Sequence, residues 1–536
     1  MRWIGLAGAL ALATAAQAQV PAAPADPIGG VFARFKADDP GCAVGVEQKG
    51  QAPVYRGFGS ADLEHGVPIT PDTIFEAGSV SKQFTAAAIL LLAADGKLAL
   101  SDDIRKYLPE MPDYGRPITI DMLLSHTSGL RDWGEVAALA GWPRTSRIYT
   151  PQEVLLIAVR QKGLNYTPGE AYSYTNTGYN LAGLIVQRVS GRTLADFTKE
   201  RLFQPLGMTH TSWRDDFRRV VQGRAIAYEP GQNGSWLQEM PFENTYGHGA
   251  LLTTVGDLLI WNRALSEGRL GAGIAEKMAE RATLTGGRRI TYARGLMVLS
   301  WSGREEVSHS GATAAYRAWL ARVPSTGLSV ALLCNRADVN PVQVGHRVVD
   351  AVAPPPAAPT AARLASEPDL ARIPGAYVDE RTGNVLRVVA DKGELRVRGG
   401  GAFQPQAEAG RYTGGGMDFT FAGDTVKRVD PAGETVTFAR KAEWKPEEAD
   451  LLPLAGAYSS PEAGGVLVVS VKGGVAVIAP ADRPSAPYVI QPLYRDAFQG
   501  DGNLIRIVRD AKGKVTALRF TNSRVYALDF RRVDAR

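Results

Sequence analysis

The sequence has few of the residues that build metal sites and disulfide frameworks. Its 536 residues include two cysteines, Cys42 and Cys334, and six histidines. Two cysteines can form at most one disulfide, so the chain is not a disulfide-rich scaffold. The histidines show none of the spacings typical of zinc ligands; they are His65, His126, His210, His248, His309 and His346. We therefore expect no metal site and no cofactor.

The sequence also lacks an apolar run long enough to cross a bilayer. The apolar stretch Ile4–Ala16 follows the basic residue Arg2 and ends in a small-residue cleavage site, Ala16-Gln17-Ala18. This order is typical of a secretory signal over residues 1–18, cleaved after Ala18. We expect the mature chain to be secreted or periplasmic.

An excess of charge of one sign is absent as well. The 60 Lys and Arg residues are nearly balanced by 55 Asp and Glu, which leaves a net charge of +5 and no basic run. This distribution argues against nucleic-acid binding and is compatible with an exported protein that contacts anionic components of the cell envelope. The expected partner is a small-molecule or peptide substrate, and the oligomeric state is left open.

The segment Ser79-Val80-Ser81-Lys82 opens an Ala- and Leu-rich stretch with a helical pattern. Residues three apart share one face of a helix, so the Ser79 hydroxyl and the Lys82 amine can meet. A serine needs a neighbouring base to act as a nucleophile, and a desolvated lysine can be that base. The alternative interpretation is a capping serine followed by a solvated lysine.

Two later segments carry further candidate site residues. Tyr174-Thr175-Asn176 lies between a turn and the expected helix Asn180–Val189. Ser308-His309-Ser310-Gly311 precedes Ala312–Val323, whose alternating pattern predicts a strand. Taken alone, these segments could also hold a core aromatic residue, a turn asparagine and a structural histidine.

In this order, the three segments resemble the motifs of the penicillin-recognising serine hydrolases: Ser-x-x-Lys, Tyr-x-Asn, and a Lys-Thr-Gly or His-x-Gly on a strand. Ser79 and Tyr174 are 95 residues apart, and Tyr174 and His309 are 135 apart. Leu124–Leu130 and Gly249–Asp257 also look like markers of the class C β-lactamase-like branch. The resemblance implies an α/β (α+β) β-lactamase/transpeptidase-like domain, with a sheet built from both of its ends beside a helical lobe.

The resemblance also implies roles for these residues. Ser79 would attack a carbonyl carbon while Lys82, assisted by Tyr174, accepts its proton, and an acyl-enzyme would form. Asn176 and His309 would support the site.

The third motif bears on the oxyanion and on the substrate. The resemblance implies that the backbone N–H groups of Ser79 and Ala312 bind the oxyanion. His309 replaces a lysine of other family members and is mostly neutral near pH 7. This argues against substrates that need a fixed positive charge there, unless Arg317 or Arg322 compensates.

The chain beyond this domain differs in composition and in its predicted secondary structure. A Pro- and Ala-rich linker over residues 351–366 follows a domain of residues 19–350. Short β-rich runs then repeat, and Ile373–Tyr377 has a counterpart 81 residues later. Two such units, residues 367–447 and 448–536, predict two small antiparallel β-barrel (lipocalin-like) domains.

A β-lactamase-like domain followed by two small barrels resembles the bacterial D-aminopeptidases. In that family the last barrel sends a long loop into the active site, where it selects a free N-terminal amine. The matching region here, Pro492–Asn503, predicts a short hairpin, a more open site, and barrels that tune access rather than chemistry. If the hairpin reached the site, Asp496 or Asp501 would be candidates to bind a substrate ammonium.

The two cysteines lie in apolar, strand-like runs. The resemblance places these strands side by side in one sheet, which permits a disulfide in an oxidising compartment. The residues alone favour two buried thiols that act as small hydrophobic groups.

These observations predict an exported serine hydrolase that acts on amide or ester bonds through an acyl-enzyme. The favoured function is a D-aminopeptidase-like hydrolase of D-amino-acid peptides or amides. A carboxylesterase of the β-lactamase-like group is the alternative. A β-lactamase, a DD-carboxypeptidase or a non-catalytic envelope binding protein agrees less well with the motifs.

Overall fold

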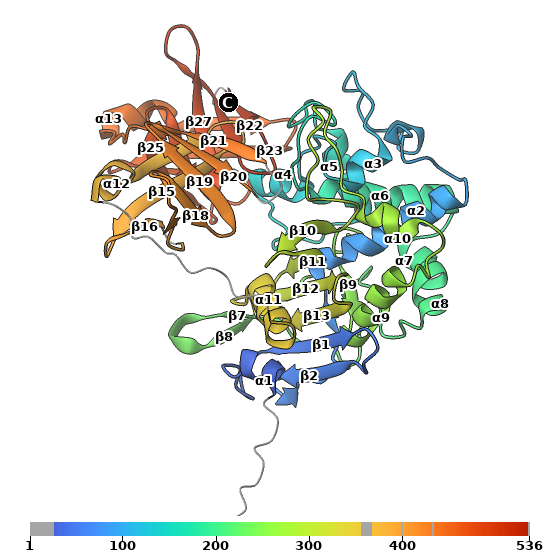
Figure 1. The fold of residues 1–536 in the computed structure, drawn as a ribbon. Helices are drawn as coiled ribbons and strands as arrows, with labels where there is room; N and C mark the ends of the chain where they lie inside the picture. Colours follow the sequence, from blue (N-terminus) through green and yellow to red (C-terminus); the bar gives the residue numbers. More distant parts are fainter. Residues whose placement is uncertain (1–25, 355–366, 399, 431–433, 534–536) are drawn as a thin grey trace, which may run out of the picture.

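The computed structural model describes residues 26–354, 367–398, 400–430 and 434–533. They form an α/β domain followed by two β-rich units (Figure 1). The predicted signal and residues 355–366 of the predicted linker lie outside the described residues. Within the described part of the chain, no helix is long and apolar enough to span a membrane.

A six-stranded antiparallel sheet forms the centre of the first domain, in the order β10-β11-β12-β13-β1-β2. Its strands are β1 Cys42–Gln48, β2 Val54–Phe58, β10 Met297–Trp301, β11 Arg304–Thr313, β12 Tyr316–Val323 and β13 Leu328–Cys334. Both ends of the domain therefore build the sheet, as the sequence predicted. Helices α1 (Pro27–Val31) and α11 (Pro341–Val352) pack on one face, and α9 (Val255–Ser266) packs on the other.

A helical lobe lies beside this sheet and is organised around α2, Lys82–Ala94 (Figure 1). Its residues from Lys82 to Leu92 are all buried, which explains why it is apolar all round rather than striped. Helix α2 packs against α6 (Asn176–Ser190), which also contacts α3 (Ile120–Leu124) and α5 (Pro151–Val159). The domain further contains α4 Trp133–Leu139, α7 Leu194–Thr198, α8 Gln204–Leu206, α10 Ile274–Ala279, β3 Ser60–Asp62, β4 Val67–Pro68, β5 Phe75–Glu76, β6 Ser212–Trp213, β7 Tyr228–Pro230, β8 Trp236–Gln238 and β9 Leu251–Thr253.

Two expected elements differ in their bounds. The alternating stretch Ala312–Val323 is not one strand, because it holds the turn between β11 and β12. Ala314 at this turn has a φ of 43°, a backbone conformation that an alternation of apolar residues does not reveal. The helix expected over Asn180–Val189 begins earlier, at Asn176, because Thr175 caps it.

Cys42 and Cys334 form a disulfide, so the favoured interpretation as two free thiols is wrong. The two residues lie directly opposite each other in the antiparallel pair of β1 and β13, with Cα atoms 4.0 Å apart. The sequence places each cysteine in a strand, but the register that sets them opposite is a property of the folded sheet.

We expect loss of this disulfide to lower the free energy of unfolding by about 2 to 5 kcal/mol, because it constrains a long loop of the unfolded chain. The bridged residues are 292 positions apart. Denaturant unfolding with and without a thiol reductant measures the effect. A Cys42→Ala/Cys334→Ala variant should unfold as the reduced wild type does and ignore the reductant. Identical unfolding of the oxidised and reduced wild type would contradict the prediction.

The first β-rich unit is an eight-stranded antiparallel sheet in the order β16-β15-β14-β21-β20-β19-β18-β17. Its elements are α12 Glu367–Arg372, β14 Gly375–Asp379, β15 Asn384–Asp391, β16 Glu394–Val397, β17 Gln404–Pro405, β18 Arg411–Gly414, β19 Met417–Ala422, β20 Thr425–Val429 and β21 Thr435–Lys441. Among the described residues its hydrogen-bonded ladder does not close, so this unit is a curled sheet rather than the expected closed barrel.

The second β-rich unit is a closed eight-stranded barrel, as predicted. Its elements are α13 Glu448–Leu451, β22 Gly456–Ser460, β23 Gly465–Lys472, β24 Val475–Pro480, β25 Tyr488–Tyr494, β26 Ala497–Gly500, β27 Asn503–Arg509, β28 Val515–Thr521 and β29 Leu528–Val533. The internal repeat has a structural counterpart. Tyr377 donates to the Ile373 carbonyl at 2.8 Å in the first unit, and Tyr458 donates to the Leu454 carbonyl at 2.7 Å in the second.

The closed barrel packs on the helical lobe. Helices α4 and α5 share one apolar cluster with the barrel interior, in which Trp133 and Phe520 are both buried. At the edge of this contact the Arg131 guanidinium pairs with the Glu462 carboxylate at 2.8 Å, and the arginine side chain is only 6% exposed. The barrel therefore packs against α4 and α5, which in turn contact α6, the helix that begins at Asn176.

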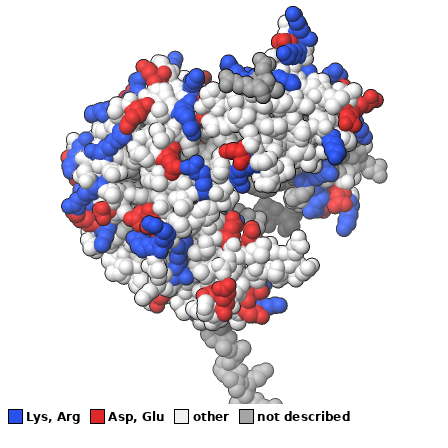
Figure 2. All heavy atoms as spheres, turned by 180° about the vertical axis from the view of Figure 1, so that it is seen from behind, with Lys and Arg blue, Asp and Glu red and all other residues white. Residues whose placement is uncertain are grey.

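Charge on the surface is mixed. On the face shown in Figure 2, Lys and Arg lie among Asp and Glu across both the domain and the β-rich units. This face of the described residues presents no continuous basic stripe of the kind that binds nucleic acid.

Candidate active site

Ser79 and Lys82 lie at the junction of the sheet and the helical lobe. Ser79 is on the short 3₁₀ turn Gly78–Ser81, and Lys82 is the first residue of α2. Lys82 Nζ is 3.1 Å from Ser79 Oγ, 2.9 Å from Asn176 Oδ1 and 2.7 Å from the His248 carbonyl oxygen. The alternative interpretation, a solvated lysine, is wrong, since the Lys82 side chain is fully buried.

The partners of Lys82 orient its amine. A neutral amine has two N–H donors and one lone pair, whereas the Asn176 and His248 oxygens can only accept. When both N–H groups point at these oxygens, the lone pair faces the Ser79 hydroxyl. In this arrangement the amine can accept the proton of the serine.

The surroundings also favour the neutral amine. Burial lowers the pKa of Lys82 well below its ordinary value, and the positive charges of Arg524 and Arg144 lower it further. The negative charge of Asp132 acts in the opposite direction. Desolvation is the largest of these effects.

Tyr174 and Asn176 lie next to the Lys82 amine. The Tyr174 ring centre is 4.8 Å from Lys82 Nζ. Burial raises the pKa of the Tyr174 phenol, and its hydrogen bond with Ser79 opposes that rise. The phenol is therefore protonated at neutral pH and lies within reach of the serine oxygen.

His309 lies on β11 and lines the same cavity. Its Nδ1 is 2.6 Å from the Ser310 carbonyl oxygen, and its Nε2 is 2.9 Å from the Tyr292 hydroxyl. Because a carbonyl only accepts, Nδ1 carries the proton and Nε2 accepts from Tyr292. Burial lowers the pKa of His309 to about 3, so it supplies no positive charge to a substrate.

The two predicted oxyanion donors lie on neighbouring segments. A Cβ built on Gly78 would be 2.6 Å from the Ala312 nitrogen, and one built on Gly311 would be 3.0 Å from the Ser79 nitrogen. The serine turn and β11 therefore approach at backbone distance, which requires glycine at both positions. Ser79 and Ala312 line one cavity of about 800 Å³ together with Tyr174, Asn176 and His309.

Asp132 is a site residue that the motifs did not single out. Its Oδ1 accepts from the Gly134 and Glu135 backbone N–H groups and caps α4. Its Oδ2 accepts from the Asn176 backbone N–H at 2.6 Å, so one buried carboxylate joins the starts of α4 and α6. In the sequence, Asp132 ends the segment Ser128–Asp132, which resembles the D-aminopeptidases, but the resemblance assigned it no role.

We expect Asp132→Asn to lower the free energy of unfolding by about 1 to 3 kcal/mol, because an amide has one acceptor oxygen for donors that come from two sides. Displacement of Asn176 should also lower kcat. Thermal unfolding and initial rates measure both effects. Asp26→Asn is the matched control, since Asp26 also caps a helix but is exposed. Equal, small effects of the two changes would contradict this role of Asp132.

The barrel contributes to the cavity through a segment that the sequence analysis did not consider. The segment Asp496–Asn503 does not contribute to the described cavity lining, and Asp496, at the turn between β25 and β26, pairs with Arg509 at 2.7 Å. Instead Arg524, from the connection between β28 and β29, lines the cavity with its guanidinium 5.2 Å from the Tyr174 ring centre. Nothing in the local sequence distinguishes this arginine from the many others.

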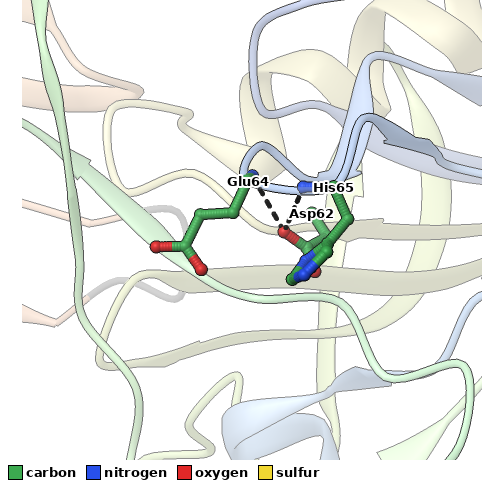
Figure 3. A group of neighbouring side chains, drawn as sticks. All are labelled: Asp62, Glu64 and His65. Atoms are coloured by element: carbon green, nitrogen blue, oxygen red, sulfur yellow. Dashed lines mark hydrogen bonds and ion pairs between the residues drawn. The ribbon is translucent and has the colours of Figure 1, made fainter.

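One group of potential metal ligands exists in the described residues, and it lies outside this cavity. Asp62, Glu64 and His65 place ligand atoms within 4.8 Å of one another (Figure 3). Asp62 accepts from the backbone N–H groups of Glu64 and His65, and the His65 ring lies 2.7 Å from it. These hydrogen bonds of a local turn account for the cluster.

Comparison with known proteins agrees with this geometry. The Beta-lactamase family model matches residues 30–353, which is more than half of the chain. The chain belongs to the beta-lactamase family. A D-aminopeptidase of Gluconobacter oxydans is 28% identical over 454 residues, covering 81% of this chain and 82% of the relative. A D-aminopeptidase of Brucella anthropi is 24% identical over 515 residues, covering 92% and 95%.

Solved structures with a similar fold are also known. The octameric penicillin-binding protein homologue from Pyrococcus abyssi has a TM-score of 0.56 at 22% identity, covering 85% of this chain and 97% of its own. The D-amino acid amidase from Ochrobactrum anthropi SV3 has a TM-score of 0.52 at 24% identity, covering 61% and 97%.

Proposed function

We propose that this protein is a serine hydrolase in which Ser79 is the nucleophile and Lys82 the general base. The observation that carries the proposal is the buried Lys82 amine, which faces Ser79 Oγ at 3.1 Å while its N–H groups are held by two carbonyl oxygens. Ser79 Oγ attacks the substrate carbonyl carbon, its proton passes to Lys82, and an acyl-enzyme forms as the leaving group departs.

The other predicted residues assist this reaction. The Ser79 and Ala312 N–H groups stabilise the negative charge on the carbonyl oxygen. The Tyr174 phenol, protonated at neutral pH, relays a proton to the leaving group. Water then attacks the acyl-enzyme and regenerates Ser79. Asn176 holds the amine in place through its side-chain oxygen.

The substrates we propose are D-amino-acid peptides or amides, in a D-aminopeptidase-like reaction. Two relatives named D-aminopeptidase are similar over 81% and 92% of the chain, which is more than the first domain alone, and support this choice. A carboxylesterase is the second candidate. It is favoured by the absence of the hairpin Asp496–Asn503 from the described cavity lining, because a less obstructed site accepts esters and N-blocked substrates.

Initial rates with D- and L-alanine p-nitroanilide, N-acetyl-D-alanine p-nitroanilide and p-nitrophenyl acetate test the proposal. We expect Ser79-dependent turnover of the D-anilides, including the N-acetylated one, and much slower turnover of the L-anilide. Fast ester turnover without any anilide turnover would favour the carboxylesterase. An absolute requirement for the free amine would contradict the open site.

We also propose that the chain acts outside the cytoplasm. The support is the signal pattern of residues 1–18, and Gln19 should be the first residue of the mature protein when its N-terminus is sequenced.

A further inference from the structure

The cavity beside Ser79 carries more positive charge than its surroundings neutralise. One carboxylate, Asp338, lines it, together with three arginines: Arg144, Arg317 and Arg524. Arg144 and Asp338 each form an ion pair with a side chain outside the cavity lining. In the described part of the chain, the guanidinium groups of Arg317 and Arg524 are not within ion-pair distance of a carboxylate.

The histidines and the lysine of the site add no positive charge of their own, and the carboxylates of Asp132 and Glu135 are the negative groups whose charges act on Lys82 and Arg524. Burial lowers the pKa of His309 to about 3 and that of His248 to about 4, so both rings are neutral at pH 7. Lys82 is also held toward its neutral form. The unpaired charge of the cavity therefore comes from its arginines.

Arg524 is fixed in position through its backbone. Asn522 Oδ1 accepts from the Arg524 and Val525 N–H groups, both at 2.9 Å. The Arg524 carbonyl accepts from the Asp132 backbone N–H at 3.2 Å and from Asn165 Nδ2 at 2.9 Å. The segment is thus joined to the helical lobe by groups that do not involve the guanidinium, and the side chain is free to serve another purpose.

The carboxylates nearest to Arg524 along the lobe have other partners. Asp132 Oδ2 accepts from the Asn176 N–H, and Glu135 Oε2 accepts from Asn522 Nδ2 at 3.2 Å. The Arg524 side chain is partly exposed and lies against the Tyr174 ring, on the cavity side. Its guanidinium therefore borders the space that a substrate would fill.

We propose that Arg524 binds a carboxylate of the substrate beside the scissile bond. A guanidinium offers paired N–H donors that match the two oxygens of a carboxylate. A substrate ammonium in the same place would meet this positive charge, and the carboxylate in the cavity lining, Asp338, is already ion-paired with Arg336. The inference rests on the proposed function and adds to it a class of substrate: D-amino-acid amides that carry a negative charge.

The carboxylate can belong to the acyl part or to the leaving group, and two matched pairs separate these sources. The acyl pair is N-succinyl-D-alanine p-nitroanilide against its N-acetyl counterpart. The leaving-group pair is the D-alanine amide of 5-amino-2-nitrobenzoate against D-alanine p-nitroanilide. Each pair differs by one carboxylate.

We expect wild type to favour the charged member of one pair by about 10- to 100-fold in kcat/KM, as is typical of a charged hydrogen bond. Arg524→Gln should remove this preference, Arg524→Lys should keep part of it, and Arg524→Glu should reverse it. The matched control is Arg495→Gln, which removes the same charge from an exposed position on the same barrel. Added salt should weaken the preference in wild type.

A second measurement does not depend on turnover. In the Ser79→Ala background, a compound with the carboxylate should raise Tm more than its neutral counterpart. The pair for the acyl part is N-succinyl-D-alanine amide against N-acetyl-D-alanine amide, and the pair for the leaving group is 5-amino-2-nitrobenzoate against p-nitroaniline; one of the two pairs should show the difference. Arg524→Gln should abolish it. The inference would be overturned if charged and neutral compounds gave equal kcat/KM in wild type and equal Tm shifts in the Ser79→Ala background. It would also be overturned if the preference for the charged compound survived Arg524→Gln. Loss of all D-anilide turnover with the binding difference intact would refute the proposed function and leave the role of Arg524 standing.

Discussion

Replacing Ser79 with alanine is expected to lower acyl turnover by roughly 10⁴-fold or more, because the covalent route disappears with the nucleophile. The fold should be retained, since Ser79 is a partly exposed residue at the edge of the cavity. Initial rates with the best p-nitroanilide or p-nitrophenyl ester measure the loss. A fluorophosphonate should label Ser79 in the wild type, and the labelled peptide is identified by mass spectrometry.

Ser81→Ala is the matched control for this experiment. Ser81 is fully buried, donates to the Gly78 carbonyl at 2.5 Å and accepts from the Leu251 N–H at 3.1 Å. Its loss should cost about 1 to 3 kcal/mol of stability, because both partners lose a buried hydrogen bond. Acyl turnover should nevertheless persist. If folded Ser81→Ala were as inactive as Ser79→Ala, Ser79 would not be the nucleophile.

The sequence predicted those pairs of site residues that lie close together in one segment of the chain. Ser79 and Lys82 are three residues apart, so the start of one helix brings them together. Tyr174 and Asn176 share the entry to α6, and His309 and Ala312 share β11. For each pair, local geometry sets the relation between the two side chains. The family resemblance then supplied how the three segments meet.

The parts that were missed depend on contacts between distant segments. The Cys42–Cys334 disulfide requires the register of β1 against β13. Arg524 reaches the cavity because the barrel packs on α4 and α5, and no local pattern encodes that contact. The expectation that the barrels leave the site unobstructed is therefore incomplete, since the hairpin stays out of the lining while a neighbouring connection supplies a charge.

The open edge of the first β-rich unit has a similar origin. The repeat correctly predicted two related units, and Tyr377 and Tyr458 make the same hydrogen bond in each. Closure of a barrel, however, depends on whether the first and last strands are long enough to pair. In the first unit the edge strand β17 has two residues, Gln404–Pro405, and a proline cannot donate to a ladder.

Lys82→Arg should lower kcat/KM by about 10²- to 10⁴-fold, the range expected when a general base is lost. An arginine keeps the positive charge but does not deprotonate, so it cannot accept the proton of Ser79. Initial rates and thermal unfolding measure the effect, and Lys82→Met serves as a neutral variant of similar length that should be equally inactive. Lys97→Arg, at an exposed lysine, is the matched control and should match wild type. An active Lys82→Arg enzyme would assign the base to Tyr174 or His309.

The pH dependence of the wild type tests the same role from the opposite direction. Burial and the charges of Arg524 and Arg144 lower the pKa of Lys82, while Asp132 raises it. Since the neutral amine is the active form, kcat/KM should rise with pH through a pKa well below that of an exposed lysine. Arg524→Gln removes one of the lowering charges, so the acid limb should move to higher pH, whereas Arg495→Gln should leave it in place. If the acid limb moved equally in both variants, or in neither, the group that titrates there would not be Lys82.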